Sequence, residues 1–213
     1  MADAIYAVPW TATFGTMVLT MWTVMMAAMM VPTSLPMLLL VFRLKPPEGG
    51  SSWSRTLAFA LGYLLIWVSF GSLLTGVQWL LNGMAMGHGV DLGPASVFGA
   101  AVLMLAGLYQ YSPWKSACLR HCQTPLGFLL SHWRDGGVGA LSMGLEHGLF
   151  CLGCCWMLML LMLVGGAMNL LWMSGITVYL FLERSLPARL RLERVSGSLL
   201  ICAGIAFAVL GAP

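Results

Sequence analysis

Charged residues are scarce in this sequence. Its 213 residues include only ten Lys and Arg and seven Asp and Glu, so that 8% of the chain is charged. A water-soluble domain carries about 25% charged residues, and this shortage excludes a water-soluble enzyme or binding domain. The basic residues also stand singly and form no cluster along the chain, which excludes nucleic acid as the main partner.

The absence of charge is concentrated in five long runs. These uncharged runs cover residues 4–42, 56–90, 92–114, 147–182 and 195–213. Each is close to or above the roughly 20 residues that cross a bilayer core as a helix. The alternating pattern of barrel strands is missing, and a helix satisfies its own backbone groups in lipid. We therefore expect an all-α integral membrane protein with a single transmembrane domain over residues 1–213. Its six transmembrane helices are expected at about 14–42, 56–81, 94–112, 138–164, 168–184 and 195–212.

The basic residues all fall in alternate connections between these helices. The first, third and fifth connections hold Arg43, Lys45 and Arg55; Lys115, Arg120 and Arg134; and Arg184, Arg189, Arg191 and Arg194. The other connections and both termini have none. By the positive-inside rule, the basic loops are expected in the cytoplasm and both termini outside, in the periplasm. The sequence thus predicts a multi-pass protein of the bacterial inner membrane, with the lipid bilayer as its surroundings.

Metal-ligand residue types interrupt the expected helix 138–164. At 100° per residue, His147, Cys151 and Cys154 fall within about 60° of one another on one helix face. Cys155 and Glu146 flank that face. Soft sulfur together with imidazole suits Cu(I) or Zn(II), and not Mg(II) or Ca(II). Glu146 is a further candidate, either as a ligand or as the group that orients the imidazole.

A second interpretation of the same residues is helix packing. Free Cys behaves as a small buried apolar residue, and small residues are what closely packed helices in lipid prefer. Against this, ionisable groups within a span cost several kcal/mol and usually mark a functional site. Both interpretations of the pair Glu146 and His147 stay open at this point.

A further pair of thiols follows the third expected helix. Cys118 and Cys122 share a face if their segment is helical, and His121 is adjacent, so the group resembles half of a metal site. Cys151 is expected roughly 20 Å below the cytoplasmic surface at 1.5 Å per residue. We expect two separate sites, because the charges of Lys115, Arg120 and Arg134 favour the aqueous face for segment 113–137. The alternative is that this segment folds back into the membrane.

The loop after the second expected helix holds a third group of possible ligands. Met84, Met86 and His88 stand at alternate positions in this outer loop. Thioethers with imidazole suit Cu(I) where thiols would be oxidised. In a chain with 17 Met residues the group can also arise by chance, so it is the weaker candidate, as is His121.

Several motifs together resemble one protein family. They are MWTVMMAAMMVPTSLPM, AGLYQYSPWKSACLRHC, GLEHGLFCLGCCWMLMLL and GGAMNLLWM. These segments are similar to the bacterial DUF2182 proteins, described as predicted metal-binding integral membrane proteins, over most of the chain. The resemblance implies that the metal residues are Cys118, Cys122, His147, Cys151, Cys154 and Cys155. It implies no counterpart for Glu146 or for the outer Met84, Met86 and His88.

Three functions are compatible with this sequence. The first is a membrane metal-handling protein that binds copper or zinc through Cys and His for transport, or for delivery to a partner metalloenzyme. The second is a non-catalytic subunit or assembly factor of a larger membrane complex, with Cys, Gly and Met as packing residues. The third, a membrane thiol oxidoreductase, is disfavoured because thiols within one regular helix pair poorly. We do not expect an enzyme.

Overall fold

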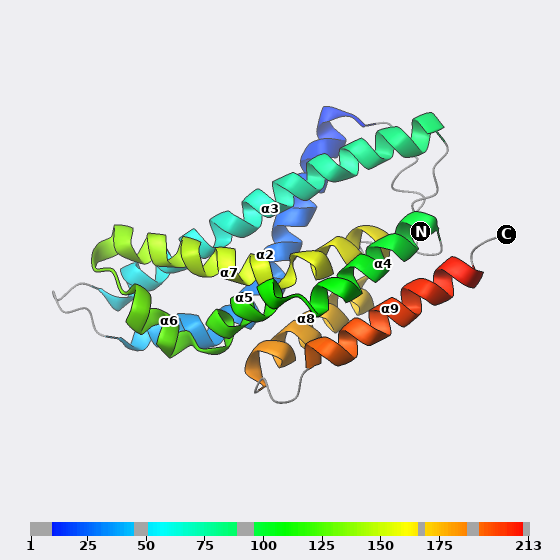
Figure 1. Ribbon diagram of the computed structural model, residues 1–213. Coiled ribbons are helices and arrows are strands. Elements are labelled where there is room, and N and C mark those ends of the chain that lie inside the picture. Colours follow the sequence, from blue (N-terminus) through cyan, green and yellow to red (C-terminus); the bar gives the residue numbers. More distant parts are fainter. Residues whose placement is uncertain (1–9, 45–50, 89–95, 166–168, 187–191, 211–213) are drawn as a thin grey trace.

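The computed structural model describes residues 10–44, 51–88, 96–165, 169–186 and 192–210, and of residues 85–88 and 210 it describes the backbone alone. All regular structure in these ranges is helical, as expected for an all-α chain. The helices are α2 (Ala12–Arg43), α3 (Ser52–His88), α4 (Val97–Gln110), α5 (Pro113–Gln123), α6 (Pro125–His132), α7 (Gly136–Gly165), α8 (Leu170–Ser185) and α9 (Leu192–Leu210). They form the bundle shown in Figure 1.

Four of the described helices are long and apolar enough to cross a membrane. They are α2, α3, α7 and α9, whereas α4 is a shorter apolar helix and α8 has 16 residues. Large apolar side chains face outward, including Val97 at 87% and Leu171 at 85% exposure. Apolar area of this kind is stabilised by lipid and not by water. The structure is therefore compatible with a membrane protein.

The segment after α4 is not a surface loop. The Ser112 hydroxyl oxygen accepts a hydrogen bond from the Trp114 N–H at 3.2 Å, and Pro113 fills the first position of α5, where a missing N–H has no cost. Both α5 and α6 pack back onto the bundle, with α5 alongside α7 (Figure 1). The expectation that the whole stretch 113–137 stays at an aqueous surface is wrong.

Two pairs of helices cross at glycines. A Cβ atom on Gly144 of α7 would overlap the Phe59 carbonyl oxygen of α3, and Gly62 of α3 meets the Leu141 carbonyl oxygen in the same way. In the second pair, a Cβ on Gly107 of α4 would lie 2.8 Å from the Gly197 carbonyl oxygen of α9. Glycine lets two backbones approach until they touch. These contacts fix α3 against α7 and α4 against α9.

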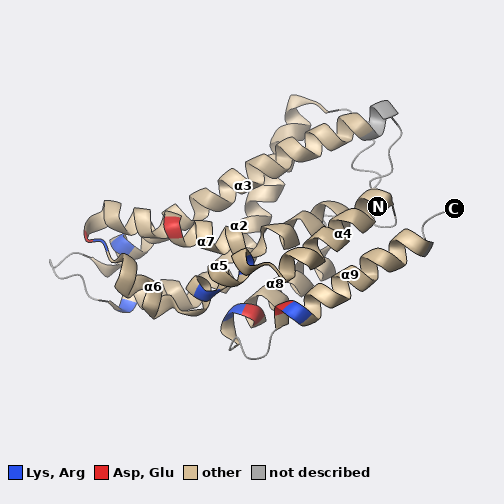
Figure 2. Cartoon of the chain, in the orientation of Figure 1, with Lys and Arg blue, Asp and Glu red and all other residues tan. Residues whose placement is uncertain are grey.

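The described charged residues are confined to one part of the bundle. They lie around the ends of α2, α6 and α8, the first parts of α3, α7 and α9, and α5, while the far ends of α3, α4 and α9 are free of charge (Figure 2). Most of these positions belong to the basic connections of the sequence. The uncharged remainder of each long helix is the part suited to a lipid surrounding.

A methyl group at the crossing of α3 and α7 should destabilise the bundle. Gly144→Ala would force the methyl group into the Phe59 backbone, and overpacking of this kind costs about 1–3 kcal/mol. We expect a lower midpoint of thermal unfolding for the detergent-purified protein. Gly76→Ala is the matched control, because no atom lies within 4 Å of its added Cβ. An equal effect of both substitutions would show that the crossing is not tight.

Candidate metal centre

The ligand residues of α7 share a buried face, as their spacing predicts. His147 is 3% exposed, and Cys151, Cys154 and Cys155 are completely buried. The Cys154 and Cys155 thiols both donate hydrogen bonds to the Cys151 carbonyl oxygen, at 3.1 and 3.0 Å. One turn of α7 therefore presents three thiols to the core, two of them held by their own helix.

Helix α5 brings two more thiols against this face. A Cβ atom on Gly153 of α7 would lie 2.8 Å from Cys118 Sγ. Cys118 and Cys122 both pack against the buried cluster that contains Cys151, Cys154 and Cys155. The thiols of α5 and α7 therefore meet inside the bundle, which favours one shared site over the two separate sites expected from the sequence.

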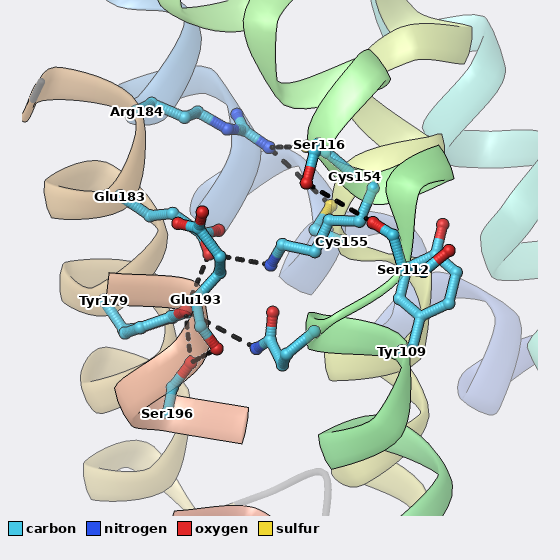
Figure 3. A network of polar contacts seen from close by, with 12 residues as sticks. Tyr109, Ser112, Ser116, Cys154, Cys155, Tyr179, Glu183, Arg184, Glu193 and Ser196 are labelled. Atoms are coloured by element: carbon cyan, nitrogen blue, oxygen red, sulfur yellow. Dashed lines mark hydrogen bonds and ion pairs between the residues drawn. The ribbon is translucent and has the colours of Figure 1, made fainter. Parts of the chain in front are cut away.

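A buried ion pair explains why α5 can leave the surface. Lys115 Nζ lies 2.7 Å from Glu183 Oε1 of α8, and both side chains are 1% exposed. The Tyr179 hydroxyl donates to the same carboxylate at 2.7 Å, and the Gln123 amide donates to the Glu183 carbonyl oxygen at 2.8 Å. The tyrosine and the carboxylate face each other on α8 in Figure 3. The carboxylate offsets the cost of removing the Lys115 ammonium group from water. The expectation that Lys115 stays at the aqueous face is therefore wrong.

Tyr63 of α3 is a site residue that the sequence did not reveal. Its hydroxyl donates to the Met30 carbonyl oxygen at 3.2 Å and lies 3.0 Å from Cys151 Sγ. The phenol has a single proton, so when it is donated to Met30 the contact with Cys151 has the thiol as donor. A tyrosine within an apolar run gives no hint of this contact.

Arg184 is the second unforeseen residue. It lies in the last turn of α8, where Nη1 donates to Thr33 Oγ1 of α2 at 2.7 Å. Its Nη2 is 3.7 Å from Cys154 Sγ and 3.6 Å from Cys155 Sγ, and Figure 3 shows the guanidinium directed to the two cysteines. In the sequence it stands at the edge of a basic connection, so it was counted there only as a topology marker.

A cavity of about 290 Å³ reaches Cys122 and His147 at the edge of the cluster. It is lined by Thr33, Ser34, Pro36, Met37, Cys122, Gln123, Pro125, His147, Arg184 and Ser185. His147 Nδ1 is buried and has no hydrogen-bond partner within the described part of the chain. A buried imidazole nitrogen without a partner costs free energy and is a suitable donor for a soft metal ion.

The other predicted ligands lie apart from the thiols or outside the description. Glu146 pairs with Arg134 at 2.6 Å, and His121 stacks on Phe150 with ring centroids 4.2 Å apart. Met84 is 49% exposed. The side chains of Met86 and His88 lie outside the described residues.

The thiols are close together but are not arranged around a metal position. Across the described ranges, no group of three or more His, Cys, Asp and Glu side chains has the geometry to hold a metal ion. The hydrogen bonds of Cys154 and Cys155 to the Cys151 carbonyl account for part of this.

One family model matches the chain, and its family is described as "PpoB2: Copper chaperone". The match covers residues 19–207, from α2 to α9. The chain belongs to this copper chaperone family. No curated protein and no solved structure matches significantly. The family supports copper, the first of the two expected metals, and gives no support to zinc.

Removal of the Lys115 charge should release α5. Lys115→Met leaves the Glu183 carboxylate buried without its cation, and breaking a buried ion pair costs about 3–5 kcal/mol. We expect a lower free energy of unfolding and faster maleimide labelling of Cys122 in the detergent-purified protein. The double variant Lys115→Met, Glu183→Leu should recover most of the stability.

Arg120→Met is the matched control, because it removes a cation from an exposed position of the same helix. Unchanged labelling of Cys122 in Lys115→Met would contradict the idea that the ion pair holds α5 in place.

Proposed function

We propose that this chain is a membrane-embedded copper chaperone that holds Cu(I) on thiols of α5 and α7 and passes it to a metalloprotein. Cys122, Cys151 and Cys154 are the main ligands. Cys155, Cys118 and His147 complete the donor set. The copper chaperone family supports the metal, and the likeness to DUF2182 proteins points to the same residues.

The contact between thiols of two helices carries this proposal. Cys122 of α5 packs against the buried cluster that contains Cys151 and Cys154 of α7, although the two helices are far apart in sequence. Thiolate and imidazole donors favour Cu(I) over hard cations. Cargo must be released as well as bound, and described thiols that are not already arranged around a metal position suit exchange better than a closed structural site does.

The cavity beside Arg184 is the proposed route for copper. Its lining comes from the last part of α2, the junction of α5 and α6, and the end of α8, which are elements next to basic connections. Copper would therefore reach Cys122 and His147 from the basic side of the protein. The partner that receives it is a metalloprotein in or at the membrane.

The membrane arrangement belongs to the same proposal. The chain crosses the bacterial inner membrane six times, with the basic loops in the cytoplasm and both termini in the periplasm. The separation of charged from uncharged helix parts supports this orientation (Figure 2). Segment 113–137, with α5 and α6, dips into the bundle from the cytoplasmic side, where protein covers it. Met84, which is exposed, would then lie with Met86 and His88 on the outer side as a release point.

Loss of a thiol from either helix should abolish tight copper binding. Cys122→Ser and Cys151→Ser each remove a ligand of the one shared site, so Cu(I) affinity should fall by more than about 100-fold, beyond the effect of residues that only support ligands. Competition with a chromophoric Cu(I) chelator under anaerobic conditions measures the affinity in detergent. Cys202→Ser is the control, because this thiol is exposed on α9.

Two results would contradict the proposal. If the wild-type protein binds no Cu(I) and the cysteine variants lose only stability, the thiols are packing residues. If Cys122→Ser removes one copper ion and leaves a second on Cys151, the helices hold two separate sites.

The topology has its own test. An alkaline phosphatase fused after Pro213 should be active, because the C-terminus is expected in the periplasm, where that enzyme forms its disulfides. A fluorescent reporter that folds only in the cytoplasm should be dark at the same position. The reverse pattern would show that the number of spans is odd or that the chain is inverted.

A further inference from the structure

The guanidinium of Arg184 is a buried positive charge beside the thiols. Its residue is only 9% exposed. Thr33 and the sulfur atoms of Cys154 and Cys155 are its recorded hydrogen-bond partners, and Nε has none within the described residues. All of these partners are neutral in their ordinary state, so they do not balance the charge.

No described carboxylate is paired with Arg184. The two ion pairs among the described residues join Lys115 with Glu183 and Arg134 with Glu146. Glu183, its neighbour in sequence, is thus already neutralised by a lysine. A buried cation without a countercharge costs several kcal/mol. Arg184 is therefore a buried positive charge without a paired carboxylate, and it lies where the thiols meet.

We propose that Arg184 is the countercharge of the loaded site and selects a monovalent metal ion held by two thiolates. This inference rests on the proposed function. Two thiolates and Cu(I) together carry one negative charge, which Arg184 balances. Two thiolates and a divalent ion are neutral and leave the guanidinium unbalanced. Any further ligand has to be neutral. The third of the cysteines Cys122, Cys151 and Cys154 meets this condition as a protonated thiol, and so does the imidazole of His147, which lines the same cavity.

A comparison of Ag(I) with Hg(II) measures the effect of the charge of the ion apart from its coordination preference. Ag(I) and Hg(II) both prefer two sulfur ligands in line, but they differ by one charge. Arg184→Gln should weaken Ag(I) binding by about 10- to 100-fold, the loss expected when a charged hydrogen-bond partner is removed. Hg(II) binding should stay the same or become tighter. Competition with a small dithiol of known affinity measures both ions on the full chain in detergent.

Matched variants isolate the charge. Arg184→Lys keeps it and should retain most of the preference for Ag(I), and Arg120→Gln removes an exposed charge of α5 and should change neither affinity. Thr33→Asp adds a carboxylate next to the guanidinium and should act like Arg184→Gln, whereas Thr33→Asn should not. The threonine pair keeps the test decisive if Arg184→Gln does not fold.

The outcomes are distinct for this inference and for the proposed function. An equal loss of Ag(I) and Hg(II) in Arg184→Gln, or an unchanged Ag(I) affinity in both Arg184→Gln and Thr33→Asp, would overturn the countercharge role while copper binding by the cysteines stands. If Cys122→Ser and Cys151→Ser bind Ag(I) and Cu(I) as tightly as the wild-type protein does, the proposed function is overturned instead.

Discussion

The ion pair between Lys115 Nζ and Glu183 Oε1, 2.7 Å apart and fully enclosed, is the contact on which the candidate site depends. It fastens α5 to α8 in the interior. Cys118 and Cys122 follow Lys115 on the same helix by three and seven residues, and both reach α7. A solvated lysine at this position would draw the start of α5 outward and separate the thiols of the two helices.

Two buried positive charges near the thiols, Lys115 and Arg184, have different partners. Lys115 has a carboxylate at hydrogen-bond distance, whereas Arg184 faces a hydroxyl and two thiols. A buried cation with a fixed carboxylate serves structure, since removal of either partner leaves the other uncompensated. A buried cation without one favours the arrival of negative charge, such as thiolates that bind a metal ion. Lys115 therefore holds the helices of the site together, whereas Arg184 sets the charge that the site favours.

Glycine crossings supply the rigid frame around these charges. Gly62 and Gly144 bring α3 to α7, and this approach places the Tyr63 hydroxyl 3.0 Å from Cys151 Sγ. The glycine contacts on one side and the ion pair on the other hold in place the helices that carry the thiols. Cys154 and Cys155 are held by hydrogen bonds to a carbonyl oxygen of their own helix and by the Arg184 guanidinium, and a hydrogen bond between neutral groups contributes about 1 kcal/mol.

The sequence by itself determined the helical class and the shared face of His147, Cys151 and Cys154. Both follow from local rules, namely the length of uncharged runs and the 100° step of a helix. Only the tertiary structure decided that Cys122 joins that face, that Tyr63 and Arg184 complete its surroundings, and that Lys115 is buried. The physical reason is that the cost of burying a charge depends on its partner, and the partner of Lys115 is 68 residues further along the chain. Composition and spacing indicate whether a residue by itself favours water or the interior. The pairing of Lys115 with Glu183 reverses the preference of Lys115 for water, and this pairing exists only in the folded bundle.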